Sequence, residues 1–318
     1  MDISIIGAGP VGLTAAAELT RNGNNITVYE KRADYTRRQV VRLKPADLNH
    51  LTTTRDIFKS KIAICDLETQ LRERAQECGV IFEHKEITDI RQIKDKIIIM
   101  TTGSKSALRD NIFGAPIHLL EPKTVVVVSY KVNNRARRTP FLAWYRTIKV
   151  LEGVAIEQIN RDTVILLWEP PEFDNHELRR RIQFWINLRG DDIVQDTIKY
   201  QSYKSVIYQM PEFATEYAGK IIFLAGDAAA GVPYFRSLQM GLENIKYLSG
   251  SGLNVNKYNS IMNTATDIQT GIGFSSSLVL NLSAFYLRIS RYSPFQINKW
   301  SETYINELSN KEVVGLQI

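Results

Sequence analysis

The fold of this chain is decided by the stretch Ile3-Ser4-Ile5-Ile6-Gly7-Ala8-Gly9-Pro10-Val11-Gly12. Its apolar beginning predicts a short buried strand, and the Gly-rich turn leads into an apolar-rich segment, Leu13–Leu19, that predicts a helix. A second strand is expected over Ile26–Tyr29, and it ends in Glu30. A strand, a Gly-rich turn, a helix, a strand and an acid, in this order, are typical of a dinucleotide-binding βαβ unit.

The residue types of this turn suit a pyrophosphate. Gly7 allows the tight turn, Gly9 lets the backbone approach the ligand, and Gly12 lets helix and strand pack closely. The helix N-terminus adds free N–H groups and a partial positive charge. Glu30 follows about 20 residues later, where a carboxylate can accept hydrogen bonds from an adenosine ribose and would repel a 2′-phosphate. We therefore expect a bound dinucleotide, although this unit alone does not separate FAD from NAD.

Two later segments bring further turns to the expected sheet. The apolar run Ile97–Met100 leads into Thr101–Arg109, and the expected strand Ile221–Ala225 runs into Gly226–Pro233. Asp227 would reach the carboxyl edge of the sheet, where it can accept hydrogen bonds from ribitol hydroxyls. A helix that begins between Gln239 and Leu242 would favour the negative charge of a reduced flavin. The alternative is an ordinary strand–loop–helix crossover with Asp227 as a cap.

The three segments together resemble those of the group A flavoprotein monooxygenases, the class built on the para-hydroxybenzoate hydroxylase fold. That class carries GxGxxG near the start, a strand-D-G-x-x-S-x-x-R segment in the middle and a G-D-A-A-x-x-x-P segment late. The matching residues here are Gly7, Gly9, Gly12, Gly103, Ser106, Arg109, Gly226, Asp227 and Pro233. Within the class, Glu30-Lys31-Arg32, the segment Tyr35–Pro45 and Ile64–Glu68 are similar to the MICAL-type monooxygenase domain.

This resemblance implies an enzyme with FAD as its cofactor and NADPH or NADH as its reductant. It implies a monooxygenase that hydroxylates an unidentified substrate through a C4a-hydroperoxyflavin, with chemistry that belongs to the cofactor rather than to a catalytic side chain. We expect Arg109, Lys105 and Arg37 to face the reductant. The cofactor-binding residues expected in all are Gly7, Ala8, Gly9, Pro10, Val11, Gly12, Glu30, Lys31, Arg32, Arg37, Gln39, Thr102, Gly103, Arg109, Gly226, Asp227, Pro233, Gln239, Met240 and Gly241.

Two residues depart from the family pattern. The acid of the middle motif is Thr102 here, and Cys65 stands where many members have Arg or Gln near the FAD diphosphate. Either change can weaken the binding of FAD or of the reductant. Two other functions therefore stay open on the same fold. One is a flavin oxidoreductase without oxygenation, or a halogenase-like enzyme, and the other is a non-catalytic FAD-binding regulatory or interaction protein.

The expected architecture is an α/β fold with two lobes and a tail. A Rossmann-like FAD-binding lobe takes residues 1–110 and 216–255, a smaller β-rich substrate lobe takes residues 111–215, and a helical C-terminal tail takes residues 256–318. In the substrate lobe we expect strands over Thr124–Tyr130, Ala155–Ile159 and Thr163–Trp168, and a helix over Leu178–Leu188. Aromatic residues that can line a substrate pocket there are Trp144, Tyr145, Trp168, Tyr200 and Tyr208, although core packing is the commoner role of such residues.

Composition narrows the class of partner. The 318 residues contain no apolar run long enough to span a bilayer, and the N-terminus does not resemble a signal peptide. The two cysteines, Cys65 and Cys78, and the four histidines show no metal-ligand spacing, which favours a reducing, cytoplasmic setting without a metal site. The net charge of +6 favours anionic ligands. We expect a small-molecule or protein substrate, which can be acidic, and no nucleic acid; the oligomeric state is not indicated.

Overall fold

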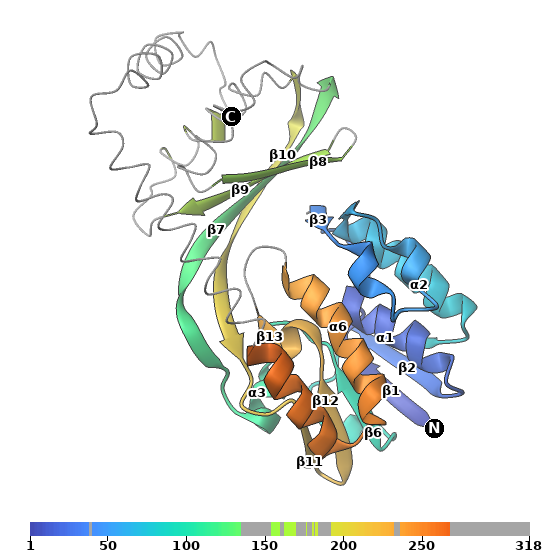
Figure 1. Ribbon diagram of the computed structural model, residues 1–318. Coiled ribbons are helices and arrows are strands. Elements are labelled where there is room, and N and C mark those ends of the chain that lie inside the picture. The colour runs from blue at the N-terminus through green and yellow to red at the C-terminus, as the bar shows by residue number, and fades with distance from the viewer. Residues whose placement is uncertain are drawn as a thin grey trace.

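The structure is a computed structural model that describes residues 1–37, 40–134, 154–159, 162–169, 176, 180, 182–183, 192–231 and 236–267. Two large sheets organise these residues (Figure 1). Several expectations lie wholly or largely outside the described residues: those for Gln39, Pro233, Trp144 and Tyr145, for the helix over Leu178–Leu188, and for the tail beyond residue 267.

The first sheet has six strands in the order β11-β12-β6-β1-β2-β5. All neighbouring pairs are parallel except β11 with β12. The strands are β1 (Asp2–Ile6), β2 (Asn25–Glu30), β5 (Ile81–His84), β6 (Ile97–Met100), β11 (Ala214–Tyr217) and β12 (Lys220–Leu224). This sheet confirms the expected parallel α/β fold.

The register of the central strands brings the three expected turns together. Ile6 at the end of β1 pairs with Met100 at the end of β6, and Met100 pairs in turn with Leu224 at the end of β12. The turns that follow these strands therefore leave the sheet side by side, at its carboxyl edge. Ligands of open α/β sheets bind at this edge.

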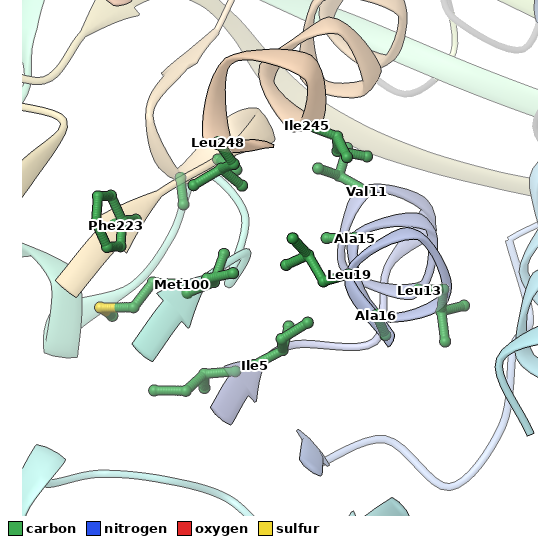
Figure 2. Packing of buried hydrophobic residues seen from close by; sticks show 14 of the residues in the cluster. Ile5, Val11, Leu13, Ala15, Ala16, Leu19, Met100, Phe223, Ile245 and Leu248 are labelled. Carbon is green, nitrogen blue, oxygen red and sulfur yellow. The ribbon is translucent and has the colours of Figure 1, made fainter. Parts of the chain in front are cut away.

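Helices α1 (Pro10–Thr20), α2 (Ile64–Glu77) and α6 (Arg236–Ser251) pack with this sheet, and α1 contacts both of the others. Figure 2 shows side chains of α1 and α6 meeting above the strands. The labelled residues are Ile5, Val11, Leu13, Ala15, Ala16, Leu19, Met100, Phe223, Ile245 and Leu248. The expectation that the last helix begins between Gln239 and Leu242 is wrong, because nothing in Arg236-Ser237-Leu238 stops helical turns and α6 begins at Arg236.

The second sheet has five antiparallel strands in the order β13-β10-β7-β9-β8. They are β7 (Ile117–Asn134), β8 (Val154–Ile159), β9 (Asp162–Glu169), β10 (Asp192–Gln209) and β13 (Ala230–Gly231). The long strands β7 and β10 run between the two lobes (Figure 1). The three strands expected in this lobe are confirmed within β7, β8 and β9. Because β13 follows the turn of Asp227, it ties the second sheet to the first.

Short elements complete the described chain. β3 (Val40–Arg42) and β4 (Lys61–Ala63) form a small antiparallel sheet, and α3 (Ala107–Phe113) follows the turn after β6. Single 3-10 turns are η1 (Pro45–Leu48), η2 (Arg55–Ile57), η3 (Ile90–Gln92) and η4 (Gly226–Ala228). Helical turns occupy residues 255–267, where the expected C-terminal helical segment begins. Within the described residues, no helix combines the length and apolarity needed to cross a membrane.

Candidate functional site

The Gly-rich turn after β1 is held in its shape by the chain itself. Gly7 has a φ of 104°, which favours glycine, and its N–H donates to the carbonyl of Tyr29 at 2.8 Å. A Cβ placed on Gly12 would lie 2.1 Å from the carbonyl oxygen of Gly7 and 2.4 Å from Oγ1 of Thr101. Gly7 and Gly12 are therefore required by the backbone and by the neighbouring turn, as the sequence predicts for the tight turn and the close packing.

Gly9 differs from both of these glycines. Its φ of −75° and ψ of 176° are open to any residue, and among the described residues an added Cβ would have only Nη2 of Arg37 within 4 Å, at 3.9 Å. Helix α1 begins directly after Gly9 and has no side-chain cap. The amides of its first turn therefore lie beside a space around Gly9 that the described part of the chain does not fill. Such a space at a helix N-terminus fits an anionic group such as a pyrophosphate.

Glu30 at the end of β2 is almost fully used by the protein. Its Oε2 accepts from the N–H of Ala8 at 2.8 Å and from Nη2 of Arg32 at 3.0 Å, and its Oε1 accepts from N and Nε of Arg32 at 2.8 and 3.1 Å. Burial alone would raise the pKa of Glu30, but the hydrogen bonds from Arg32 and Ala8 together lower it. A ribose that binds Glu30 must therefore displace the Arg32 side chain, which is 37% exposed.

A second acid, Glu68 on α2, lies next to this pair. Its side chain is fully buried, and its Oε1 forms an ion pair with Nη2 of Arg37 and lies 3.7 Å from Nη1 of Arg32. Its Oε2 has no hydrogen-bond partner among the described residues. Burial raises the pKa of Glu68, and the charges of Arg37 and Arg32 oppose this rise. Arg37 thus stands between a buried acid and the space beside Gly9.

The turn after β6 is closed by its own arginine. Arg109 is 1% exposed, and its guanidinium donates to the carbonyls of Gly103, Ser104 and Ala228 at 3.4, 3.1 and 3.5 Å. It also pairs with the carboxylate of Asp110 at 2.6 Å. The expectation that Arg109 faces a reductant stays a prediction, and it requires this nearly inaccessible side chain to move. In the folded chain its charge holds two turns of the sheet edge together.

Thr101 and Thr102 stand at the start of the same turn. Oγ1 of Thr101 donates toward the carbonyls of Gly7 and Ile6, at 2.7 and 3.1 Å, and so joins this turn to the one after β1. Oγ1 of Thr102, which replaces the acid of the family pattern, is buried and finds no partner in the described part of the chain. Lys105 is exposed. Of Lys105 and Arg109, the two cations expected to face a ligand from this turn, Lys105 is the exposed one.

The turn after β12 presents Asp227. Its side chain is exposed, and one oxygen accepts a hydrogen bond from the hydroxyl of Ser237 on α6. Surrounding protein nevertheless desolvates the carboxylate and raises the pKa of Asp227, while Ser237 and the charge of Arg37 oppose the rise. The backbone carbonyl of Asp227 accepts from the hydroxyl of Tyr208 on β10. The carboxylate of Asp227 is thus held in place and open to a polyol.

Several other expected residues are placed around these turns. Gly226 has a φ of 66°, and its N–H donates to Asn244 at 2.9 Å. Gly241 allows α6 to approach Val11, since an added Cβ would lie 2.6 Å from Cγ2 of Val11. Met240 is buried, and Oε1 of Gln239 accepts from the N–H of Lys44 at 3.3 Å. Lys31 is exposed and pairs with Glu86 at 3.0 Å, so the structure does not bring it to the turns.

Sequence reasoning missed Glu68 and Ser237 as parts of this site. A signal for Glu68 was available, because the buried residues of α2 recur at Ile64, Leu67, Glu68, Leu71 and Ala75, which is the spacing of one helix face. An acid on that apolar stripe must be paired or neutralised. The sequence offers no comparable signal for Ser237, because the helix is expected to begin only after this residue.

Comparisons with known proteins agree with this geometry. The family of NAD(P)-binding Rossmann-like domains matches residues 5–37. The thiamine thiazole synthase of Thermotoga maritima is 56% identical to this chain over 32 residues, which are 10% of this chain and 13% of that protein. The chain therefore matches only a small part of this curated relative. The family match falls on the β1-α1-β2 unit.

Solved structures are similar over much more of the chain. The p-nitrophenol 4-monooxygenase PnpA from Pseudomonas putida DLL-E4 matches with a TM-score of 0.64 and 14% identity, over 98% of this chain and 94% of that one. The flavin-dependent brominase Bmp2 matches with a TM-score of 0.62 and 14% identity, over 92% and 91%. Aklavinone-11 hydroxylase, solved with FAD and aklavinone, matches with a TM-score of 0.56 and 12% identity, over 79% and 62%. The chain therefore has the fold that these monooxygenases and this flavin-dependent halogenase share.

Proposed function

We propose that this protein is an FAD-dependent monooxygenase that uses NADPH or NADH and oxygen to hydroxylate its substrate. The observation that carries the proposal is the arrangement at the sheet edge. The space that the described residues leave beside Gly9 follows β1, and the guanidinium of Arg37 follows the neighbouring strand β2. The exposed carboxylate of Asp227 follows β12, which β6 separates from β1 at the same carboxyl edge. The fold shared with solved monooxygenases supports the proposal.

Three parts of FAD, its diphosphate, its adenosine ribose and its ribitol, have a chemically matched group in this proposal. The diphosphate would lie at Gly9 and the first turn of α1, with Arg37 as its counter-charge. Glu30 would accept hydrogen bonds from the adenosine ribose, and Asp227 from the ribitol. When bound, FAD supplies the oxidation of the nicotinamide and the activation of oxygen.

The protein contributes binding and orientation. Ser237 holds the Asp227 carboxylate, and Tyr208 holds the carbonyl of the same residue from the second sheet. Arg109 fixes the turn after β6, which leaves Lys105 and Arg37 as the cations that can meet the phosphates of a reductant. The net charge of +6 suits such a phosphorylated reductant. The proposed setting is the cytoplasm, in agreement with the free thiols of Cys65 and Cys78.

The finer resemblance to the MICAL-type domain belongs to this proposal as well. It rests on Glu30-Lys31-Arg32 and the segment that follows, in which Arg37 now has a defined place beside Gly9. The substrate in this proposal is a small molecule or a protein that lies between the two sheets.

Anaerobic mixing tests the enzyme directly. FAD-loaded protein is mixed with millimolar NADPH or NADH, and flavin absorbance is followed before oxygen is admitted. We expect the flavin to bleach, and we expect hydrogen peroxide to form once oxygen enters without substrate. Flavin that stays oxidised with both nucleotides, but bleaches with dithionite, would contradict the proposal.

A second candidate is an FAD-binding regulatory or interaction protein without catalysis. The observation that favours it is Thr102, whose buried hydroxyl lacks a partner among the described side chains and brings no charge where the family pattern has an acid. The same mixing experiment separates the two functions. A third outcome, reduction by the nucleotide without hydroxylation of any substrate tested, would favour an oxidoreductase or a halogenase-like enzyme.

A further inference from the structure

Glu68 is a buried acid at an anion site, where a negative charge is not expected to help binding. Its side chain is 0% exposed, and its Oε1 pairs with Arg37, while its Oε2 has no partner in the described chain. Removing a carboxylate from water costs several kcal/mol unless its partners offset the loss. A diphosphate beside Arg37 would in addition be repelled by it. The charge of Glu68 therefore does not explain its place.

The geometry of Arg37 explains it better. Its side chain is 44% exposed, its Nη2 would lie 3.9 Å from a Cβ added to Gly9, and Glu68 forms an ion pair with the same nitrogen. Helix α2 also holds the backbone of this residue, because the N–H of Cys65 donates to the carbonyl of Arg37 at 2.8 Å. Two residues in the first turns of one helix thus fix both ends of an otherwise exposed arginine.

We propose that Glu68 is a positioning residue, which holds the guanidinium of Arg37 beside Gly9 so that it is in place for the diphosphate of a dinucleotide. This inference rests on the FAD site of the proposed function. An exposed arginine side chain loses much rotamer freedom when it binds an anion. An arginine that is already fixed loses less, so the same contact gives a higher affinity.

Two substitutions separate the position of Arg37 from the charge beside it. Glu68→Asp keeps the charge but shortens the side chain, so that the carboxylate no longer reaches Arg37 from the α2 backbone. Glu68→Gln keeps the length and an oxygen acceptor but removes the charge. ADP is the probe, because it carries the ribose and the diphosphate but no flavin, and isothermal titration calorimetry gives its affinity.

We expect Glu68→Asp to weaken ADP binding by roughly tenfold, which is the upper end of the entropic cost of immobilising one long side chain. We expect Glu68→Gln to keep the wild-type affinity or to exceed it. The matched control is Glu73→Asp, at an exposed position of the same helix, which should change nothing. The effect of Glu68→Asp should also disappear in an Arg37→Ala background, because a positioning residue acts only through its partner.

The outcomes are distinct. Wild-type affinity in a folded Glu68→Asp variant, or an equal loss with and without Arg37, would overturn this inference and leave the FAD site standing. If Glu68→Asp does not fold, Arg37→Lys tests the same ion pair through its exposed member. The affinity for ADP should fall by a similar factor, because a lysine ammonium lacks the planar guanidinium that can bind Glu68 and a phosphate at the same time. Failure of the wild-type protein to bind either ADP or FAD would overturn the proposed function itself.

Discussion

The turn after β1 and the turn after β6 leave adjacent parallel strands, yet they differ in what they offer a ligand. The first has an open space at Gly9 and an uncapped helix N-terminus. The second is filled by Arg109, whose guanidinium is bound to carbonyls of its own turn and of the turn after β12. A motif therefore predicts where the backbone turns, but not whether its polar groups are free.

The physical reason lies in the range of the interactions. The glycine spacing of the first turn acts over a few residues, so its effect can be derived from the sequence. The environment of Arg109 depends on Ala228 and Tyr208, which are more than 90 positions away in the chain and arrive only with the fold. An arginine in a phosphate-binding motif is therefore not by itself a phosphate ligand.

The largest expected effect is that of Gly12→Ala. An added Cβ would lie 2.1 Å from the carbonyl oxygen of Gly7 and 2.4 Å from Oγ1 of Thr101, so both turns must shift. We expect the free energy of unfolding to fall by about 3 kcal/mol or more, at the upper end of overpacking costs. Urea unfolding measures this quantity, and an unchanged midpoint would show that the first turn is not closed by packing at this glycine.

The second-largest expected effect is that of Arg109→Ala. It leaves the carbonyls of Gly103, Ser104 and Ala228 without their donor, and we expect a loss of about 2–4 kcal/mol in the free energy of unfolding. The control Arg91→Ala removes a side chain that is 73% exposed and should cost at most about 1 kcal/mol. The opposite result would be an equally small loss of unfolding free energy in both variants, with a higher KM for the reductant in Arg109→Ala alone. It would show that Arg109 contacts the reductant.

Gly9→Ala, unlike the two preceding substitutions, should affect FAD binding rather than stability. Its backbone conformation suits alanine, and the nearest atom to the new Cβ is 3.9 Å away. Because the described residues leave room for this Cβ, we expect the free energy of unfolding to stay within about 1 kcal/mol of wild type, and the affinity for FAD to fall about tenfold or more. Parallel urea and FAD titrations check this, and a loss of stability without a loss of affinity would place the ligand elsewhere.

The smallest expected effect concerns the two acids beside the open turn. Hydrogen bonds from Arg32 and Ala8 lower the pKa of Glu30, so its contribution to stability is present above its unfolded pKa of about 4.3 and is lost as the pH falls through its folded pKa. Burial raises the pKa of Glu68, so its contribution is present below about 4.3 and is lost as the pH rises through its folded pKa.

Unfolding measurements between about pH 3 and pH 7 can separate these contributions. In Glu30→Gln, the free energy of unfolding should fall less than in wild type as the pH is lowered. In Glu68→Gln, it should fall less than in wild type as the pH is raised. Since the first group is nearly buried and the second fully so, each effect is on the order of 1 kcal/mol. The same pH slope in both variants would contradict the assigned directions.

Local rules predict much of the fold and part of the site. The strands β1, β2, β6 and β12 and the roles of Gly7 and Gly12 follow from apolar runs and glycine spacing. The start of α6 was predicted too late, because Arg236-Ser237-Leu238 contains no signal against or for a helix start. Arg37 was expected near the cofactor, but the acid that holds it was not, because Glu68 meets it only through the packing of α2.

The most direct test of the open first turn is the equilibrium binding of FAD to the folded, wild-type chain, followed by flavin fluorescence and competed with ADP. We expect saturable, equimolar binding that ADP displaces, because both ligands need the space beside Gly9 and the fixed charge of Arg37. Well-folded protein that takes up no FAD at high micromolar concentration, or FAD that ADP does not displace, would contradict it.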